Sequence, residues 1–156
     1  PSAAAPRAVR ERGVCASSSR SFRTKNDLAV SLVDRALEYV RPRIVVFDTW
    51  YGLKEVMTHI DSQGLVFVTE SKSNGLIEDG GKKRVRRYLV AHQDEFVEVD
   101  TGTEYRFVHE VVSKTEGDLV VRFVLLKKAR DENAIVPITN ALDVSVRDMI
   151  ISYGRR

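Results

Sequence analysis

The sequence predicts an α/β fold with a mixed sheet, followed by a β-rich antiparallel region. Helix-like and strand-like segments alternate between residues 24 and 70, and the connections between them are short. The right-handed crossover rule makes the two strands of this part parallel neighbours. Residues 95–128 then hold three strand-like runs separated by turn residues, which predicts an antiparallel meander.

The first predicted helix covers residues 24–40, where apolar side chains recur at spacings of three and four. Thr24 or Asn26 can cap it, because short polar side chains accept hydrogen bonds from free backbone N–H groups. Pro42 ends the pattern, since proline cannot donate a backbone hydrogen bond. The run IVVF at 44–47 is short, continuous and apolar, which is typical of a strand buried on both faces.

A second amphipathic helix is expected over residues 53–63, with Gly64 at its carboxyl end, and LVFVTE at 65–70 is expected to be a second buried strand. Residues 71–90 combine Ser, Asn and Gly with a dense run of cations, which favours a loop. After the meander, NAIVPITN supplies one more short strand. The chain is expected to close with a helix over 143–156, capped by Asp143.

Composition bounds the class of protein. The chain has 156 residues, 43% of them hydrophobic and 30% charged, which suits one domain with a core, and its net charge is +3. This mild basic bias permits nucleic acid as a partner. Cys15 is the only cysteine, which excludes an internal disulfide. Residues 1–22, rich in Ala, Ser and Arg, are expected to be a disordered leader, with an organelle transit peptide as the alternative. Apolar runs are too short for a membrane span, so a cytoplasmic location without a membrane partner is expected.

Two features are candidates for function. Asp48 follows the first predicted strand; a carboxylate there either caps the next turn or reaches a hard cation beyond the carboxyl end of the sheet. The second feature is a dense basic cluster, which is either a solvated surface or a phosphate-contacting segment whose neighbour Tyr88 stacks on a base or sugar. The basic cluster consists of Lys82, Lys83, Arg84, Arg86 and Arg87.

Other chemistries find little support in the sequence. His59, His92 and His109 lack the spacing of transition-metal ligands. No glycine-rich phosphate-binding motif is present, and nucleophile motifs for acyl transfer are absent.

Four stretches together resemble a known family: SFRTKNDLAVSLVDRAL, IVVFDTWYG, LVFVTESKSNG and ITNALDVSVRDMIISYGRR. They are similar to the DDE-class transposases of insertion sequences, in the group typified by insertion sequence four. The likeness covers the chain from about Ser21 onward. It implies a partial RNase H-like fold over residues 23–156, a mixed sheet with helices, carrying a β-rich antiparallel insertion at about 82–140.

Carried over residue by residue, Asp48 matches the second of three catalytic, metal-binding carboxylates. Residues 72–74 match the family's KSN stretch, and Thr139 with Asn140 matches its TN strand end. Tyr153 and Arg156 match the first two members of the terminal signature, in which the catalytic Glu would follow four residues after Arg156. The first catalytic Asp lies upstream in the family, and residues 1–22 do not match that strand.

The resemblance therefore implies a catalytic-domain fragment that is inactive alone, because two Mg²⁺ or Mn²⁺ ions in the intact enzyme need three carboxylates. It implies DNA as partner, both insertion-sequence ends and target, a nucleoid location, and a homodimer as an allowed form. The alternatives are a non-catalytic DNA-binding remnant, or an unrelated α/β nuclease or phosphate-binding module that uses Asp48. Glu70 is the nearest second carboxylate for such a module, although a surface or loop-capping role is favoured for it. The expected DNA contacts are the basic cluster, Tyr153 and Arg156, with Arg106, Lys127, Lys128 and Arg130 as further phosphate contacts.

Overall fold

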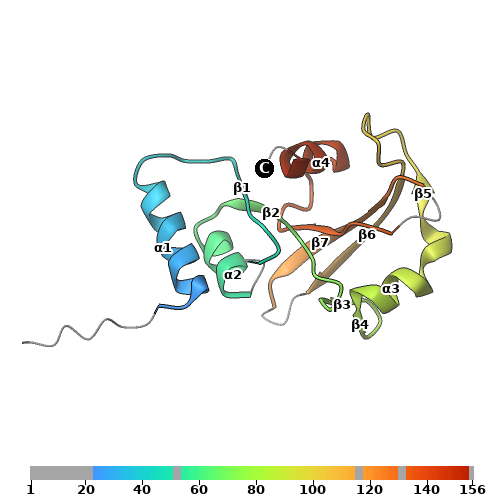
Figure 1. The fold of residues 1–156 in the computed structure, drawn as a ribbon, viewed down its shortest axis with the longest axis horizontal. Helices are drawn as coiled ribbons and strands as arrows, with labels where there is room; N and C mark the ends of the chain where they lie inside the picture. The colour runs from blue at the N-terminus through green and yellow to red at the C-terminus, as the bar shows by residue number, and fades with distance from the viewer. Residues whose placement is uncertain (1–22, 51–53, 115–117, 130–132, 155–156) are drawn as a thin grey trace, which may run out of the picture.

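A computed structural model describes residues 23–50, 54–114, 118–129 and 133–154. The fold is mixed α/β, with a six-stranded mixed sheet in the order β1-β2-β8-β7-β6-β5 and a separate two-stranded hairpin, β3-β4 (Figure 1). The elements are α1 (Lys25–Leu37), β1 (Ile44–Val46), α2 (Lys54–Ser62), β2 (Val66–Glu70), β3 (Leu76–Glu78), β4 (Lys82–Arg84), α3 (Val85–Ala91), the 3₁₀ turn η1 (Gln93–Glu95), β5 (Val97–Glu98), β6 (Phe107–Lys114), β7 (Val120–Lys127), β8 (Pro137–Thr139) and α4 (Val146–Gly154).

The first four elements confirm the predicted α/β order. Thr24 caps α1 in a reciprocal capping box with Asp27, so each accepts a hydrogen bond from the other's backbone N–H. Gly64, just after α2, has a φ of +68°, a conformation that glycine adopts without strain. β1 and β2 pair in parallel, with Val45 opposite Phe67.

Helices cover both faces of the sheet. Neighbouring side chains on a strand point to opposite faces, and Phe67 and Val68 accordingly belong to two different apolar clusters. The cluster around Phe67 packs under α2, α3 and the β3-β4 hairpin, whereas Val68 packs under α4. Figure 1 shows α4 and α3 on opposite sides of the long β6-β7 pair.

The predicted meander is confirmed, since β5, β6 and β7 pair antiparallel in sequence. β8 then lies between β7 and β2, antiparallel to both. Residues 82–140, expected as a β-rich insertion, therefore contribute four strands to the same sheet that holds β1 and β2.

The predicted loop and the predicted cap of the last helix were wrong. Residues 71–90 are not a loop, because β3 and β4 turn through Gly80 and Gly81, both at positive φ, and α3 follows directly. Val85 and Tyr88 are both buried and have helical spacing, but the cations around them make the segment resemble a polar loop. Asp143 does not cap α4: Ser145 accepts a hydrogen bond from the backbone N–H of Asp148 and donates one to its carboxylate.

β1 is the edge strand of the sheet, and its side chains are half-buried rather than buried as predicted. An apolar groove of about 480 Å³ runs along it, between α1 and the strand. Leu32 on α1 stands at this groove with 68% of its surface exposed. The predicted leader, residues 1–22, lies outside the described residues. Within the part of the chain that is described, none of the helices combines the length and apolar character that a membrane crossing requires.

Candidate nucleic-acid interface and the Asp48 edge

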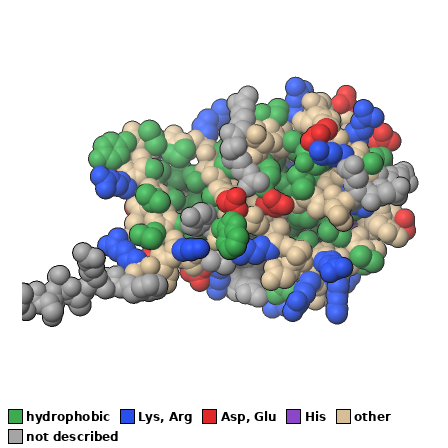
Figure 2. All heavy atoms as spheres, in the orientation of Figure 1, with side chains coloured by type: hydrophobic (Ala, Val, Ile, Leu, Met, Phe, Trp, Pro, Cys, Tyr) green, Lys and Arg blue, Asp and Glu red, His purple; other side chains and the backbone are tan. Residues whose placement is uncertain are grey.

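The basic cluster lies on β4 and the first turn of α3. Helical spacing turns Val85 and Tyr88 into the core, and this leaves Arg86 and Arg87 exposed on the opposite side of α3. β4 is fully exposed and pairs only with β3, so Lys82 and Arg84 also face solvent. Figure 2 shows Lys and Arg side chains gathered on the side of the molecule where this hairpin lies.

Three of these cations line a cavity together with part of the KSN stretch. The cavity has a volume of about 550 Å³, and none of its lining residues is acidic. The backbone N–H of Arg86 donates to the carbonyl of Ser73, which fixes the two segments side by side. The cavity is lined by Ser73, Asn74, Arg84, Arg86 and Arg87.

Gly75 follows the KSN stretch and hydrogen-bonds to the start of α3. The backbone N–H of Val85 donates to the carbonyl of Gly75 at 2.8 Å. A Cβ at position 75 would stand 2.5 Å from Oγ of Ser71, closer than real Cβ atoms come, and 3.0 Å from the carbonyl oxygen of Lys72, which is tighter than most real contacts. Residues 73–74 and the basic cluster are separated in the sequence. They meet because the β3-β4 hairpin folds the chain back on itself.

Tyr88 is not available to stack on a base, contrary to the interpretation from sequence. Its ring is 1% exposed, and its hydroxyl donates to a carboxylate oxygen of Asp79 at 2.9 Å. Burial raises the pKa of the Tyr88 phenol well above its ordinary value, and the bond to Asp79 raises it further. Tyr88 therefore anchors the basic helix to the core instead of contacting a ligand.

Asp48 is exposed and lies two residues beyond β1, at the carboxyl edge of the parallel pair. Its Oδ1 accepts hydrogen bonds from the Thr49 hydroxyl at 3.0 Å and from the Trp50 backbone N–H at 3.2 Å. These bonds stabilise the turn after the strand. A hard oxygen ligand suits Mg²⁺, but among the described residues Asp48 belongs to no group of three potential metal ligands. The residues present at this edge therefore do not form a two-metal site by themselves.

The end of α4 meets the carboxyl end of β2. The Tyr153 hydroxyl donates to the Glu70 carboxylate, and Glu70 is the last residue of β2. Tyr153 is 8% exposed, so the structure gives this side chain a packing role, and its predicted DNA contact stays a prediction. Arg156 and Arg130 lie outside the described residues.

Asn140 joins three elements at the other end of β2. Its Oδ1 accepts from the backbone N–H of Phe67 at 2.9 Å, and its Nδ2 donates to the Leu65 carbonyl at 2.9 Å and to Asp61 at 2.7 Å. Thr139 is fully buried on β8. The TN stretch thus lies away from Asp48, and its contacts hold β8 against β2.

The other predicted phosphate contacts are separate from the basic cluster. Arg106 and Lys127 lie where β6 begins and β7 ends, whereas the β3-β4 hairpin contacts Ser113 near the far end of β6. About seven strand residues at roughly 3.3 Å each put some 23 Å between these places. Lys128 forms an ion pair with Glu104 at 2.7 Å.

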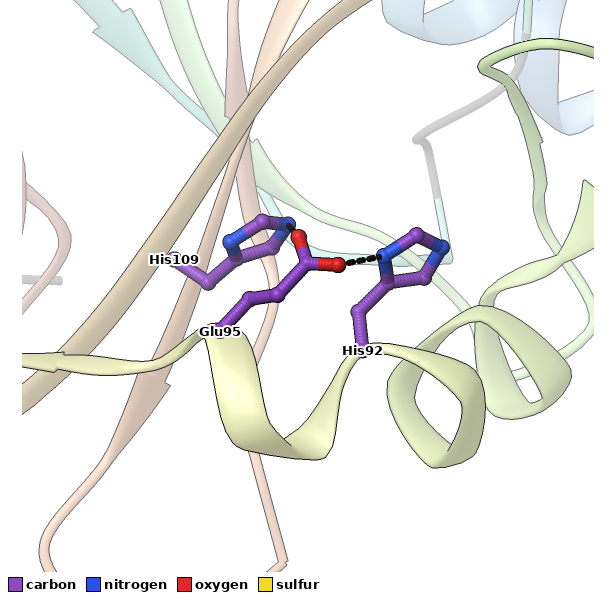
Figure 3. Close-up of side chains that lie close together, drawn as sticks. All are labelled: His92, Glu95 and His109. Carbon is purple, nitrogen blue, oxygen red and sulfur yellow. Dashed lines mark hydrogen bonds and ion pairs between the residues drawn. The ribbon is translucent and has the colours of Figure 1, made fainter.

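A cluster that the sequence did not suggest lies behind α3. His92 and Glu95 belong to the turn that follows this helix, and His109 is on β6 (Figure 3). Nδ1 of His92 lies 2.8 Å from one Glu95 oxygen, and Nε2 of His109 lies 3.7 Å from the other. The two histidines are 17 positions apart in the sequence, so no local motif indicated that they meet; the register of β5 on β6 brings them together.

Comparison with known proteins adds no relative: none of the family models matches the chain, and no match was found among curated proteins.

Proposed function

We propose that this chain is part of the catalytic domain of a DDE-class insertion-sequence transposase, in which it binds DNA and supplies one carboxylate, Asp48, to an RNase H-like metal site. The warrant is the sequence resemblance of four motifs in family order. The intact enzyme would cleave and join DNA with two Mg²⁺ or Mn²⁺ ions, which act on the attacking and leaving oxygens of a phosphoryl transfer.

One observation carries the proposal. Asp48 lies two residues beyond β1 and Glu70 ends β2, and because these strands are parallel neighbours both acids lie at one edge of the sheet. Tyr153 places the last described turn of α4 at the same edge through its bond to Glu70. Two motifs that are about a hundred residues apart in the sequence, the Asp48 strand end and the terminal helix, therefore converge where ligands of open α/β sheets bind.

The basic cavity supports DNA as the partner. Three guanidinium groups with Ser73 and Asn74 offer charge and hydrogen-bond donors to a phosphate, and arginine favours such contacts because its planar fork can bind two oxygens. Contacts of this kind set the position of a duplex without reading its sequence. The cavity alone therefore accounts for affinity, and end recognition would require other contacts.

The free edge of β1 supports an RNase H-like sheet. No strand of the described residues pairs with this edge, and the groove beside it is apolar. A strand edge left in this state favours pairing with a further strand. In the proposed enzyme the strand that carries the first catalytic Asp would take this place.

A second candidate is a DNA-binding module without catalysis. It is favoured by the two hydrogen bonds that Asp48 accepts from its own turn, since they give this carboxylate a structural use that needs no metal. Both candidates predict DNA binding, and they differ in whether the coding sequence continues. Sequencing the flanking DNA decides between them: an in-frame Glu four residues after Arg156 and an upstream Asp on an apolar strand favour the transposase. Stop codons or frameshifts on both sides favour the module.

DNA binding is tested with fluorescently labelled duplex and the purified chain over a series of salt concentrations. We expect log affinity to fall with log salt at a slope of about −0.9 for each phosphate contacted. Arg84→Ala, Arg86→Ala and Arg87→Ala should each weaken binding and reduce this slope by up to about 1. Arg35→Ala removes an exposed arginine on α1 and should change neither.

Affinity that is independent of salt, or equal losses in the Arg35 control, would contradict the interface. Cleavage is measured with the same samples in Mg²⁺ and in Mn²⁺, and we expect none from the chain alone. Metal-dependent nicking that Asp48→Ala abolishes would show that the chain already holds a complete active site, which the proposal denies.

A further inference from the structure

We propose that His92, Glu95 and His109 bind one divalent transition-metal ion of the zinc class, at a site separate from Asp48 and from the arginine-lined cavity. His92 lies at the junction of α3 and η1, Glu95 is the last residue of η1, and His109 is on β6. They form the one group of three potential ligands found among the described residues (Figure 3).

The ligand atoms are close to the spacing that a metal requires. All three lie within 4.8 Å of one another. Zinc binds nitrogen and oxygen at about 2.0–2.2 Å, which separates neighbouring ligand atoms of a tetrahedron by about 3.4 Å. In the metal-free chain the two imidazoles meet different oxygens of Glu95, at 2.8 Å from Oε1 to His92 and 3.7 Å from Oε2 to His109, so rotation of the exposed Glu95 side chain would bring one oxygen between them.

The ring nitrogens that face the carboxylate are the ones available to a metal. His92 presents Nδ1 to Glu95, while its Nε2 is buried and makes no hydrogen bond to any residue that the structure describes. His109 presents Nε2, which also lies 3.2 Å from the Tyr88 hydroxyl. Because the Tyr88 hydroxyl donates to Asp79 and a carboxylate only accepts, both presented nitrogens act as donors in the metal-free chain. The ion would therefore displace these two protons, and each ring would keep its proton on the other nitrogen.

Packing holds the two imidazoles in place. Their side chains are 17% and 13% exposed, whereas Glu95 is 55% exposed and leaves an approach from solvent. His92 stacks on the ring of Tyr88 with a centroid distance of 4.0 Å, and the rings of His92 and His109 are nearly parallel. Because these side chains are already held in place, they lose less conformational entropy when they bind a metal.

The donor set selects the ion. Two imidazoles and one carboxylate suit Zn²⁺ and its neighbours, whereas Mg²⁺ and Ca²⁺ prefer oxygen ligands alone. Three protein ligands leave a fourth position for water, and the nearby Tyr88 hydroxyl can hydrogen-bond to a water there.

The ion would join the end of α3 to β6. This helix is only seven residues long, and its first turn carries Arg86 and Arg87 of the basic cluster. A metal ion bound at the carboxyl end of α3 would therefore restrict the motion of the helix that carries Arg86 and Arg87. The metal site does not depend on the proposed transposase function, since either DNA-binding candidate would gain the same rigidity.

The test uses the full chain with Cys15→Ser, which removes a thiol that could bind zinc by itself. Zn²⁺ and Co²⁺ binding are measured by calorimetry and by the visible spectrum of tetrahedral Co²⁺, with Mg²⁺ as a comparison ion. Glu95→Gln keeps the size of an exposed side chain, and His109→Gln removes a second ligand. His59→Gln is the matched control, because His59 pairs with Asp34 on another part of the surface.

We expect one Zn²⁺ per chain, no saturable binding of Mg²⁺, and a zinc-dependent rise in melting temperature. Loss of a ligand should exceed the 10–100-fold cost seen for residues that only support ligands, so Glu95→Gln and His109→Gln should weaken binding by more than about 100-fold. The His59→Gln protein should bind like the parent. Equal binding by the Glu95 and His109 variants, or no binding by the parent, overturns the proposal, whatever the DNA-binding result.

Discussion

Replacing Asn140 should strongly destabilise the fold without affecting DNA contacts. In Asn140→Ala the backbone N–H of Phe67, which is fully buried, and the carbonyl of Leu65 both lose their hydrogen-bond partner. An unsatisfied buried backbone group costs about 1–3 kcal/mol. Taking about 2 kcal/mol for the fully buried Phe67 and about 1 kcal/mol for the half-buried Leu65, the free energy of unfolding should fall by about 3 kcal/mol.

Urea denaturation followed by circular dichroism measures this effect. With a urea dependence of about 2 kcal/mol/M, the midpoint should move down by about 1.5 M. Asn74→Ala is the matched control, since Asn74 is exposed and lines the basic cavity; its change in stability should stay within about 0.5 kcal/mol. A midpoint shift below about 0.5 M for Asn140→Ala, or an equal shift for the Asn74 control, would refute the structural role given to Asn140.

Three further changes test other parts of the structure. Arg122 is 11% exposed and donates a hydrogen bond to the carbonyl of Val144, just before α4. Arg122→Leu should therefore lower the free energy of unfolding, measured by urea denaturation, by about 2–3 kcal/mol. Arg122→Lys should lower it as well, because lysine lacks the planar guanidinium fork. Leu32→Glu should leave the melting temperature unchanged, because Leu32 is exposed at the apolar groove beside the edge strand. An unpaired apolar edge also favours pairing between copies of the chain, so the substitution should reduce self-association in sedimentation velocity, and unchanged association would contradict pairing at this edge. Hydrogen bonds from Thr24 lower the pKa of Asp27 below its ordinary value of 3.8. The ionised Asp27 therefore contributes fully to the stability of the folded chain above pH 3.8, and this contribution is lost as the pH falls through the lowered pKa. Helicity measured by circular dichroism should fall over that range in the parent, and Thr24→Ala should remove this part of the pH dependence.

The sequence predicted those elements whose apolar spacing is long or uninterrupted. α1, α2 and the first two strands follow directly from such patterns, and the antiparallel meander follows from alternation and turn residues. β3, β4 and α3 were missed because each has seven residues or fewer, and cations fill the positions that face water. A short helix gives little periodicity, and the burial of Val85 and Tyr88 comes from tertiary packing.

The candidate site was predictable in part for the same reason. Asp48 could be placed at a strand end because the strand before it is continuous and apolar. The cavity that joins Ser73 to the arginines depends on a hairpin turn, and the meeting of His92 with His109 depends on the register of β5 on β6. Neither arrangement leaves a local signal in the sequence, because both are made by pairing between distant segments.

The position of β8 has a consequence for the order in which the chain folds. Glu70 pairs with Pro137, and β8 separates β2 from β7, so the parallel β1-β2 pair has no direct strand contact with the β5-β6-β7 meander. The meander is local and can form early, whereas the β2-β8 ladder must close a long loop before it gains any pairing energy. On a ribosome, β2 would therefore expose an unpaired edge until residues 137–139 have emerged. Insertion of this three-residue strand would then join the two halves, which makes it the expected late step of folding.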